Sequence, residues 1–261
     1  MRFDGKSIVV TGGALGIGQA ACELLAERGA AIAILDRDET AGRDTCRKIE
    51  ARGGRAIFKP VNVADFGAVE AAVQEAAKLF GGFNALVASA GIQRYGSALT
   101  TSDDEWEEVI RVNLKGAWNV ARATLPFMQT AGGGAVVNVS SVQALATQSN
   151  VMAYTVSKHG LIGLTRSMAI DFATQNIRVN AVCPGSVDTP MLRWAASLDP
   201  DPQSVIDTCN RMHPLGRIAA PREIAEVIAF LLHDSSSFVT GAVWTVDGGL
   251  LAQLGGAPRA D

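Results

Sequence analysis

The sequence predicts an α/β protein: a doubly wound, Rossmann-type parallel sheet of seven strands with helices on both faces. Short apolar runs alternate with longer stretches of helical periodicity along almost the whole chain. The runs are continuously apolar rather than alternating, which is typical of parallel strands buried on both faces. A glycine-rich turn lies between the first strand and the first helix, where sheets of this kind bind phosphate groups.

The seven expected strands are short runs rich in alanine, valine, isoleucine and leucine. They are Ser7–Val10, Ala31–Leu35, Ala56–Phe58, Ala85–Ala88, Ala135–Val139, Ile177–Val182 and Ala242–Val246. Helices are expected at Gly16–Arg28, Asp38–Ala51, Asp65–Phe80, Ser102–Met128, around Tyr154 and at Pro221–His233. Asp65 is expected to cap the third helix, Gly116 is a candidate interruption of the fourth, and Pro221 opens the last.

The length and composition suit one soluble domain. The chain has 261 residues, 48% of them apolar, and a formal net charge of −3. We expect residues 1–261 to form a single unit that combines the cofactor and substrate sites. The near-neutral charge without Lys/Arg clusters argues against nucleic acid or an anionic membrane as partner. No signal peptide or bilayer-spanning run is evident, so we expect a cytoplasmic protein.

One proline-rich stretch, Pro190–Pro214, shows no helical or strand pattern. Long loops in compact domains are often functional, so residues 190–215 are predicted to form a lid over the substrate; the alternative is an irregular insertion. The tail Leu254–Arg259 lacks a packing pattern, and it either frays or docks on a neighbouring subunit.

The cysteines and histidines show no spacing that suits a metal or a redox motif. We therefore expect buried thiols, structural histidines and no metal site. The residues concerned are Cys22, Cys46, Cys183, Cys209, His159, His213 and His233.

Tyr154 and Lys158 lie four residues apart in the helix after the fifth strand, so their side chains share one helical face. An ammonium beside a phenol favours the phenolate and lowers the pKa of the phenol, which suits general acid/base chemistry. Taken alone, the pair is equally well explained as a surface contact.

The turn Thr11–Gly18 reads T-G-G-A-L-G-I-G. Glycine permits a tight turn and close approach of the backbone to a diphosphate, and the following helix N-terminus supplies hydrogen-bond donors. The residues expected to contact the cofactor here are Gly12, Leu15, Gly16, Ile17 and Gly18. Asp36 ends the second strand, where a carboxylate accepts from the adenosine ribose and repels a 2′-phosphate. We therefore predict NAD rather than NADP, with Arg37 as the residue that weakens this preference.

With this turn and Tyr154-x-x-x-Lys158 both present, the chain resembles the single-domain branch of the short-chain dehydrogenase/reductase family over nearly its entire length. Val246-Asp247-Gly248-Gly249 is similar to the C-terminal signature of that family. The resemblance implies a catalytic set of Asn113, Ser141, Tyr154 and Lys158. It also implies further cofactor contacts at Asn62, Val63, Ser89, Ala90, Gly91, Pro184, Gly185, Val187 and Thr189, in addition to Tyr154 and Lys158.

In that family Tyr154 would act as the general base, and Ser141 would hydrogen-bond the reacting oxygen. Lys158 would favour the phenolate and bind the nicotinamide ribose, and Asn113 would hold a water in a proton relay. Two positions depart from the family pattern. Asn62 replaces an aspartate, although its carbonyl can still accept from adenine. Ser89 replaces an asparagine and is expected to make only some of its backbone hydrogen bonds.

The implied reaction is hydride transfer between NAD(H) and a secondary alcohol or ketone. The substrate is expected to contact Gln93, Arg94, Gln143, Arg193 and Trp194, within a wall that also includes Tyr95, Leu145, Val187, Leu192 and His213. These donors favour a polyol, sugar or sugar acid. A hydroxysteroid, a cyclic diol or a 3-oxoacyl substrate is the alternative. A non-catalytic dinucleotide sensor is an alternative of a different class, but it would not need Ser141, Tyr154 and Lys158 together.

The resemblance also suggests a homotetramer, in which the helices after strands four and five pack against their mates. Small residues on these helices would allow close approach: Ala117, Ala121, Ala153, Gly160 and Gly163. The alternative is that these residues pack within the subunit.

Overall fold

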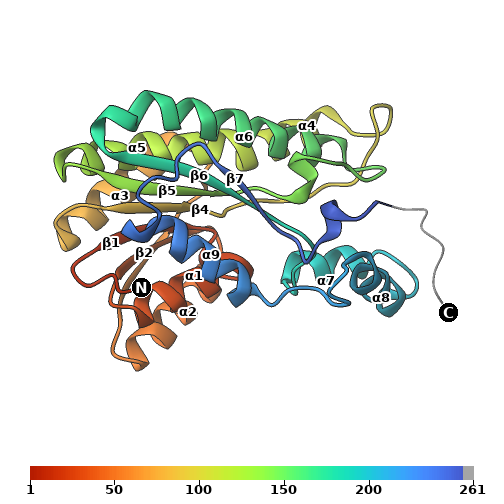
Figure 1. Cartoon of the computed structure of the whole chain (residues 1–261), viewed down its shortest axis with the longest axis horizontal. Coiled ribbons are helices and arrows are strands. Elements are labelled where there is room, and N and C mark those ends of the chain that lie inside the picture. Colours follow the sequence, from red (N-terminus) through yellow and green to blue (C-terminus); the bar gives the residue numbers. More distant parts are fainter. Residues whose placement is uncertain (255–261) are drawn as a thin grey trace.

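The computed structural model describes residues 1–254 and contains one parallel sheet in the order β3-β2-β1-β4-β5-β6-β7 (Figure 1). Each hydrogen-bonded pair of strands is parallel. The strands are β1 Ser7–Thr11, β2 Ala31–Asp36, β3 Arg55–Pro60, β4 Ala85–Ala88, β5 Gly134–Val139, β6 Ile177–Pro184 and β7 Val243–Val246. The predicted seven-stranded, doubly wound sheet is confirmed.

Helices cover both faces of the sheet, with α1, α2 and α9 on one face and α3, α5 and α6 on the other (Figure 1). The α-helices are α1 Gly16–Glu27, α2 Glu39–Ala51, α3 Phe66–Phe80, α4 Asp103–Ile110, α5 Gly116–Thr130, α6 Met152–Phe172, α7 Pro190–Ala196, α8 Pro202–Met212 and α9 Pro221–Leu232. The short helices are η1 Arg111–Lys115 (a π-helix), η2 Val142–Ala144, η3 Ala173–Gln175, η4 Asp234–Ser236 and η5 Leu250–Ala252.

Two apolar layers explain why the strands read as continuous apolar runs. Successive residues of a strand point to opposite faces. In β1, Ile8 and Val10 enter the layer beneath α1 and α9, whereas Val9 enters the layer beneath α3 and α5. Both layers are closed to solvent, so apolar residues are favoured on both faces of the strand.

Several helices begin where the sequence predicts. Asp65 caps α3 by accepting from the backbone N–H of Ala68 at 3.2 Å. Ser102 and Glu105 form a reciprocal capping box at the start of α4. Pro221 occupies the first position of α9, where its missing N–H has no helical partner to lose.

The single helix predicted over Ser102–Met128 is instead α4, η1 and α5 in direct succession. The widened turn, η1, lies immediately before Gly116, the predicted interruption. A Cβ at Gly116 would lie 2.6 Å from Val63, so this helix packs closely against the loop after β3. Asn113 lies inside the π-helix, and such bulges frequently mark functional sites.

The prediction of an irregular stretch over Pro190–Pro214 is wrong, because this stretch forms α7 and α8. Pro190 and Pro202 occupy first helical positions, and the side chains of Thr189 and Asp201 cap the two helices. Proline is favoured at that position, since the N–H it lacks would be unpaired there anyway. In Figure 1 both helices project beyond one end of the sheet.

Four of the five small residues predicted at a subunit interface pack inside the subunit. Ala117, Ala121 and Ala153 are buried. A Cβ at Gly160 would meet a leucine of the same subunit at 2.8 Å. Gly163 differs from these four, because a Cβ there would meet nothing within 4 Å. The alternative, packing within the subunit, therefore holds for the four.

The four cysteines carry free thiols, and Cys22, Cys46 and Cys183 are buried as expected, whereas Cys209 is partly exposed. Across residues 1–254, no grouping of His, Cys, Asp and Glu side chains suits a metal ion. In the same range, none of the helices has the length and apolar character needed to cross a membrane. The prediction for the tail falls, from residue 255 onward, outside the described residues.

Candidate active site

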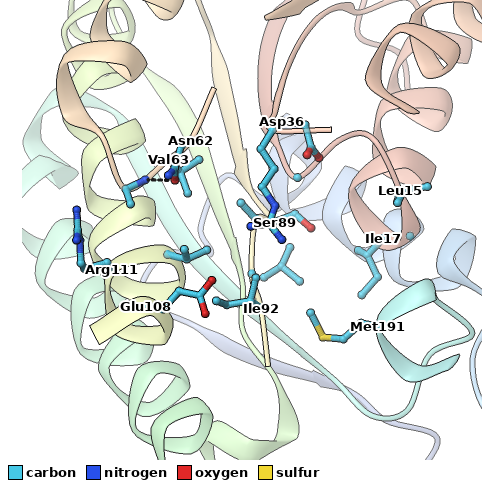
Figure 2. A pocket seen from close by; sticks show the side chains of 18 of the residues that line it. Leu15, Ile17, Asp36, Asn62, Val63, Ser89, Ile92, Glu108, Arg111 and Met191 are labelled. Carbon is cyan, nitrogen blue, oxygen red and sulfur yellow. Dashed lines mark hydrogen bonds between the residues drawn. The ribbon is translucent and has the colours of Figure 1, made fainter. Parts of the chain in front are cut away.

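A cavity of about 630 Å³ opens at the carboxyl ends of the strands, where the order of the sheet reverses between β1 and β4 (Figure 2). Ligands of open α/β sheets bind at this switch point. The cavity brings together most of the predicted cofactor residues: Gly12, Leu15, Gly16, Ile17, Asp36, Asn62, Val63, Ser89, Ala90, Gly91, Tyr154, Lys158 and Thr189. Gly18, Pro184, Gly185 and Val187 lie outside its lining.

The turn between β1 and α1 requires glycine at several positions. A Cβ at Gly12 would lie 2.7 Å from the backbone of Ala90, and a Cβ at Gly18 would overlap the carbonyl oxygen of Gly12. The φ angle of Gly16 is +59°, in the left-handed region that favours glycine. Because α1 begins at Gly16, its N-terminal N–H groups and the positive end of its dipole border the cavity. The turn therefore fits a diphosphate.

Gly18→Ala is expected to weaken NADH binding by roughly ten- to hundredfold, because the added methyl group forces the turn to move. Gly67→Ala in α3 is the matched control, since its methyl group would meet only the Asp65 carboxylate, at 3.6 Å. Fluorescence titration with NADH measures both variants. Wild-type affinity in Gly18→Ala would contradict the assignment of this turn.

The Asp36 carboxylate is fixed in the cavity wall by two backbone amides. Its Oδ2 accepts from the N–H of Ala14 at 3.1 Å, and its Oδ1 accepts from the N–H of Asp38 at 3.0 Å. Each oxygen retains a second lone pair. The carboxylate can therefore still accept from ribose hydroxyls, and Arg37 lines the same cavity.

The loop after β3 is also held in place. The Oδ1 of Asn62 accepts from the N–H of Ala64 at 3.0 Å (Figure 2), and Asn119 of α5 donates to the carbonyl of Val63 at 2.9 Å. Asn62 is exposed, so its amide remains accessible from the cavity.

Thr11 ties β1 to the segment after β4, a role that the sequence analysis did not assign. Its Oγ1 accepts from the N–H groups of Ser89 and Ala90 at 3.2 and 3.3 Å. We expected the Ser89 side chain to make some backbone hydrogen bonds here, but in the described residues this segment is held through its own N–H groups, which donate to Thr11. The pattern in the sequence that could have indicated this role of Thr11 is a threonine at the end of a strand, immediately before a glycine turn.

Tyr154, Lys158 and Ser141 come together between α6 and the end of β5. Tyr154 and Lys158 are both buried, and the Nζ of Lys158 lies 5.5 Å from the centre of the Tyr154 ring. Lys158 donates to the carbonyl of Val139 at 2.9 Å. The Ser141 side chain lies close enough to the phenol of Tyr154 to lower its pKa. The three side chains thus form one cluster at the edge of the cavity.

The two adjacent serines have different partners. Ser140 donates to the backbone carbonyl of Lys158 at 3.1 Å and so fastens α6 to the end of β5. The Oγ of Ser141 accepts from the N–H of Gln143 at 3.1 Å and caps η2. Of the two serines, Ser141 is the one whose side chain lowers the pKa of Tyr154.

The prediction that Lys158 lowers the pKa of Tyr154 is not met. Burial raises the pKa of Tyr154 to about 12, and the nearby Ser141 side chain opposes this only in part. Burial also lowers the pKa of Lys158 to about 8. The cause is desolvation, which disfavours the charged form of each group. In addition, the ammonium donates to the Val139 carbonyl rather than to the phenol.

Asn113 bridges three segments around Lys158. Its Nδ2 donates to the carbonyl of Ile92 at 2.9 Å and to the Oγ of Ser157 at 3.0 Å, and its Oδ1 accepts from the N–H of Ile92 at 2.8 Å. A Cβ at Gly91 would lie 3.5 Å from Oδ1 of Asn113 and 3.6 Å from Nζ of Lys158. Asn113 and Lys158 therefore lie against the same glycine, and the water relay stays a prediction.

Three of the predicted polar substrate residues are engaged by protein partners. The pairs are Arg94 with Glu108 (2.8 Å), Arg193 with Asp188 (2.9 Å for each of two hydrogen bonds), and Gln143 with Gln148 (3.2 Å) and Thr155 (3.3 Å). Gln93 is half-buried, and its carbonyl accepts from Arg94. The side chains of Arg94, Arg193 and Gln143 are therefore not free to bind a substrate in the way that we expected.

Tyr95 and Trp194 form an aromatic pair between the segment after β4 and α7. Their ring centres lie 6.0 Å apart at an angle of 30°, and each residue is 41% exposed. Burial raises the pKa of Tyr95, and Tyr95 in turn contributes to the raised pKa of Tyr154.

His213 does not face the substrate, contrary to the prediction. It is 3% exposed, and its ring nitrogens contact the backbone of Ser186 and Cys209. No local pattern signals this role, because Ser186 lies far away in the sequence.

Comparison with known proteins shows extensive similarity. A family model described as "Enoyl-(Acyl carrier protein) reductase" matches residues 12–251. The chain is 43% identical to cis-4-hydroxycyclohexanecarboxylate dehydrogenase of Sinomonas cyclohexanicum, over 96% of this chain and 98% of that protein. It is 35% identical to cyclohexanol dehydrogenase of Acinetobacter sp. (strain SE19), over 95% of each.

Among solved structures, the ligand-free aldohexose dehydrogenase of Thermoplasma acidophilum superposes with a TM-score of 0.91. The two chains are 34% identical, and the match covers 99% of this chain and 98% of that chain.

Proposed function

Because this chain belongs to the short-chain dehydrogenase/reductase family, we propose that it transfers a hydride between NAD(H) and a cyclic secondary alcohol or its ketone. The observation that carries the proposal is the cluster of Ser141, Tyr154 and Lys158 beside a cavity built for a dinucleotide. A dinucleotide sensor would need the cavity but not the cluster. When bound, the nicotinamide supplies the hydride acceptor or donor.

We propose a role for each side chain of this cluster. In the oxidation direction, the phenolate of Tyr154 removes the hydroxyl proton of the substrate. Ser141 donates a hydrogen bond to the reacting oxygen and stabilises its developing charge. Burial raises the pKa of Tyr154 to about 12, and in this structure Lys158 does not lower it. We therefore propose that the phenolate needs the positive charge of the oxidised nicotinamide, when bound, in addition to that of protonated Lys158. Asn113 holds the segment containing Gly91 against Lys158.

The side chains that we expect to contact the substrate favour an apolar ring over a sugar. The arginines that would bind hydroxyls or a carboxylate are paired with Glu108 and Asp188, whereas Tyr95 and Trp194 present aromatic surface. Two relatives are named for hydroxylated cyclohexane rings, which agrees with this surface. We therefore place a cyclic alcohol ahead of the polyol or sugar that the sequence alone favours.

A substrate panel tests the proposal. Cyclohexanol, cis-4-hydroxycyclohexanecarboxylate, an aldohexose and a hydroxysteroid are each incubated with NAD and the protein, and NADH formation is followed by absorbance. The highest kcat/KM is expected for the cyclohexane alcohols. Activity confined to aldohexoses would refute the cyclic-alcohol assignment, and no turnover of any secondary alcohol would refute the proposed reaction.

Trp194→Ala is expected to raise the KM for cyclohexanol by about tenfold, because it removes apolar surface from the substrate side. The KM for isopropanol serves as the internal control and should change little, because isopropanol is too small to need contact with the Tyr95–Trp194 pair. An equal rise for both alcohols would show that Trp194 acts by a general structural effect.

Asp36→Asn is expected to raise the NADP:NAD ratio of kcat/KM at least about tenfold, because it removes the charge that repels a 2′-phosphate. The asparagine amide has only one acceptor oxygen, so one of the two backbone N–H groups bound to Asp36 loses its acceptor. This loss affects both cofactors, and the ratio of the two kcat/KM values therefore isolates the effect of the charge. Asp38→Asn is the control, because Asp38 is a neighbouring carboxylate outside the cavity lining. An unchanged ratio in Asp36→Asn would contradict the NAD assignment.

We also propose a homotetramer, with the exposed apolar residues of α5 and α6 at an interface. Trp118 is 44%, Val156 42% and Ile170 78% exposed, which is unusual for large apolar side chains on neighbouring helices. Size-exclusion chromatography with light scattering tests this, and a monomer would refute it. A cytoplasmic location stays a prediction that cell fractionation would test.

A further inference from the structure

His213 connects α8 to the segment that follows β6. The Nδ1 of its ring lies 2.6 Å from the carbonyl oxygen of Cys209, and its Nε2 lies 3.1 Å from the backbone nitrogen of Ser186. Both partners are backbone groups with a single role: the carbonyl accepts and the amide donates. The ring is therefore neutral with its proton on Nδ1, a tautomer inferred from these partners.

The ring is in close contact with Gly185. A Cβ at Gly185 would lie 2.5 Å from Nε2, so the imidazole fills the space that a side chain would need. Backbone hydrogen bonds hold the same segment from other sides. The N–H of Gly185 donates to Val246 at 3.1 Å, and the carbonyl of Ser186 accepts from Ala219 at 2.9 Å. The amide of Ser186 is the group left for His213 to hold.

This segment leads directly to the cofactor cavity. Thr189, a short distance beyond Ser186, lines the cavity and caps α7. Its side chain lies 3.2 Å from the place where a Cβ of Gly16 would be, so it touches the glycine turn. A displacement of Ser186 would therefore be passed along the backbone to the wall of the cavity. His213 itself lies behind that wall and is not part of the cavity lining.

We propose that His213 is a positioning residue for cofactor binding. As an acceptor for the Ser186 amide, its neutral imidazole fixes the backbone between β6 and α7 against the cavity. The inference rests on the proposed function, because it takes NAD(H) as the ligand. It differs from a catalytic role, since the ring touches no reacting atom.

Three variants separate the two hydrogen bonds of the ring. His213→Gln carries an amide oxygen at about the reach of Nε2 and can accept from Ser186. His213→Asn is shorter and can replace only the donor to Cys209. His213→Phe keeps the volume of the ring and loses both bonds. The Kd for NADH is measured by fluorescence titration, kcat is measured at saturating NAD, and the melting temperature is measured without ligand.

A buried amide without an acceptor is expected to raise the Kd for NADH about tenfold in His213→Phe and His213→Asn. His213→Gln should stay within about threefold of the wild type, and kcat at saturation should change little in all three. If His213→Phe does not fold, the Gln and Asn variants provide the same comparison.

Wild-type NADH affinity in both His213→Asn and His213→Phe would overturn the proposal. An equal loss in His213→Gln and His213→Asn would also overturn it, since the acceptor for Ser186 would then be irrelevant. A lower melting temperature with unchanged Kd would assign His213 a structural role only. If the wild type binds no NADH, the proposed function fails, and this inference fails with it.

Discussion

Tyr154→Phe is expected to lower kcat by about 10²- to 10⁴-fold, because it removes the group that accepts the substrate proton. The ring that packs beside Lys158 is kept, so the Kd for NADH should stay within about twofold of the wild type. Steady-state kinetics with cyclohexanol and a fluorescence titration with NADH measure the two quantities separately.

The chain contains one other tyrosine, Tyr95, and the Tyr95→Phe variant therefore serves as the control. Tyr95→Phe keeps the ring that pairs with Trp194, and its kcat should stay within about tenfold of the wild type. Near-normal kcat in Tyr154→Phe would remove Tyr154 from the chemistry. A comparable loss in Tyr95→Phe alone would transfer the role to Tyr95.

The raised pKa of Tyr154 sets the direction of the pH dependence. Oxidation needs the phenolate, and below the pKa of about 12 its fraction rises about tenfold for each pH unit. The kcat/KM for alcohol oxidation should therefore rise with pH through the neutral range, whereas that for ketone reduction, which needs the protonated phenol, should not. A pH-independent oxidation would contradict this assignment.

Lys158→Met is expected to lower kcat/KM by at least about 10²-fold and yet to stabilise the folded protein at neutral pH. Burial lowers the pKa of Lys158 from 10.5 to about 8, which corresponds to roughly 3 kcal/mol of cost for the buried ammonium at pH 7. Methionine has a similar length and no charge. The lost hydrogen bond to Val139 offsets about 1 kcal/mol of this gain.

The size of this stability gain depends on pH. Between pH 8 and 10.5 the unfolded chain binds this proton and the folded protein does not, so the stability of the wild type rises with pH across that window. The stability gain of Lys158→Met should consequently be largest near pH 7 and smaller near pH 10. Urea denaturation at both pH values measures it, with the exposed Lys115→Met as the control, expected to change stability by less than about 0.5 kcal/mol. A destabilised Lys158→Met at pH 7 would refute the argument.

Local patterns in the sequence determined the sheet and much of the cavity. Apolar runs such as Ile8–Val10 specify buried parallel strands because both faces of each strand are covered, and that requirement is visible in the run itself. The glycine turn and the four-residue spacing of Tyr154 and Lys158 are equally local. The prolines that begin α7 and α8 led us to predict an irregular stretch where two helices form, because proline breaks a helix interior but is favoured at a helix start.

The tertiary structure alone decided how the site residues are engaged. Arg94 is paired with Glu108, and His213 with Ser186, across elements that the sequence does not show to be adjacent. The raised pKa of Tyr154 and the lowered pKa of Lys158 arise from burial, which depends on every segment packed around them. The sequence by itself therefore determined the sheet, the glycine turn and most of the residues that line the cavity. Only the fold decided their charges and partners, because desolvation and long-range hydrogen bonds are properties of the packed chain.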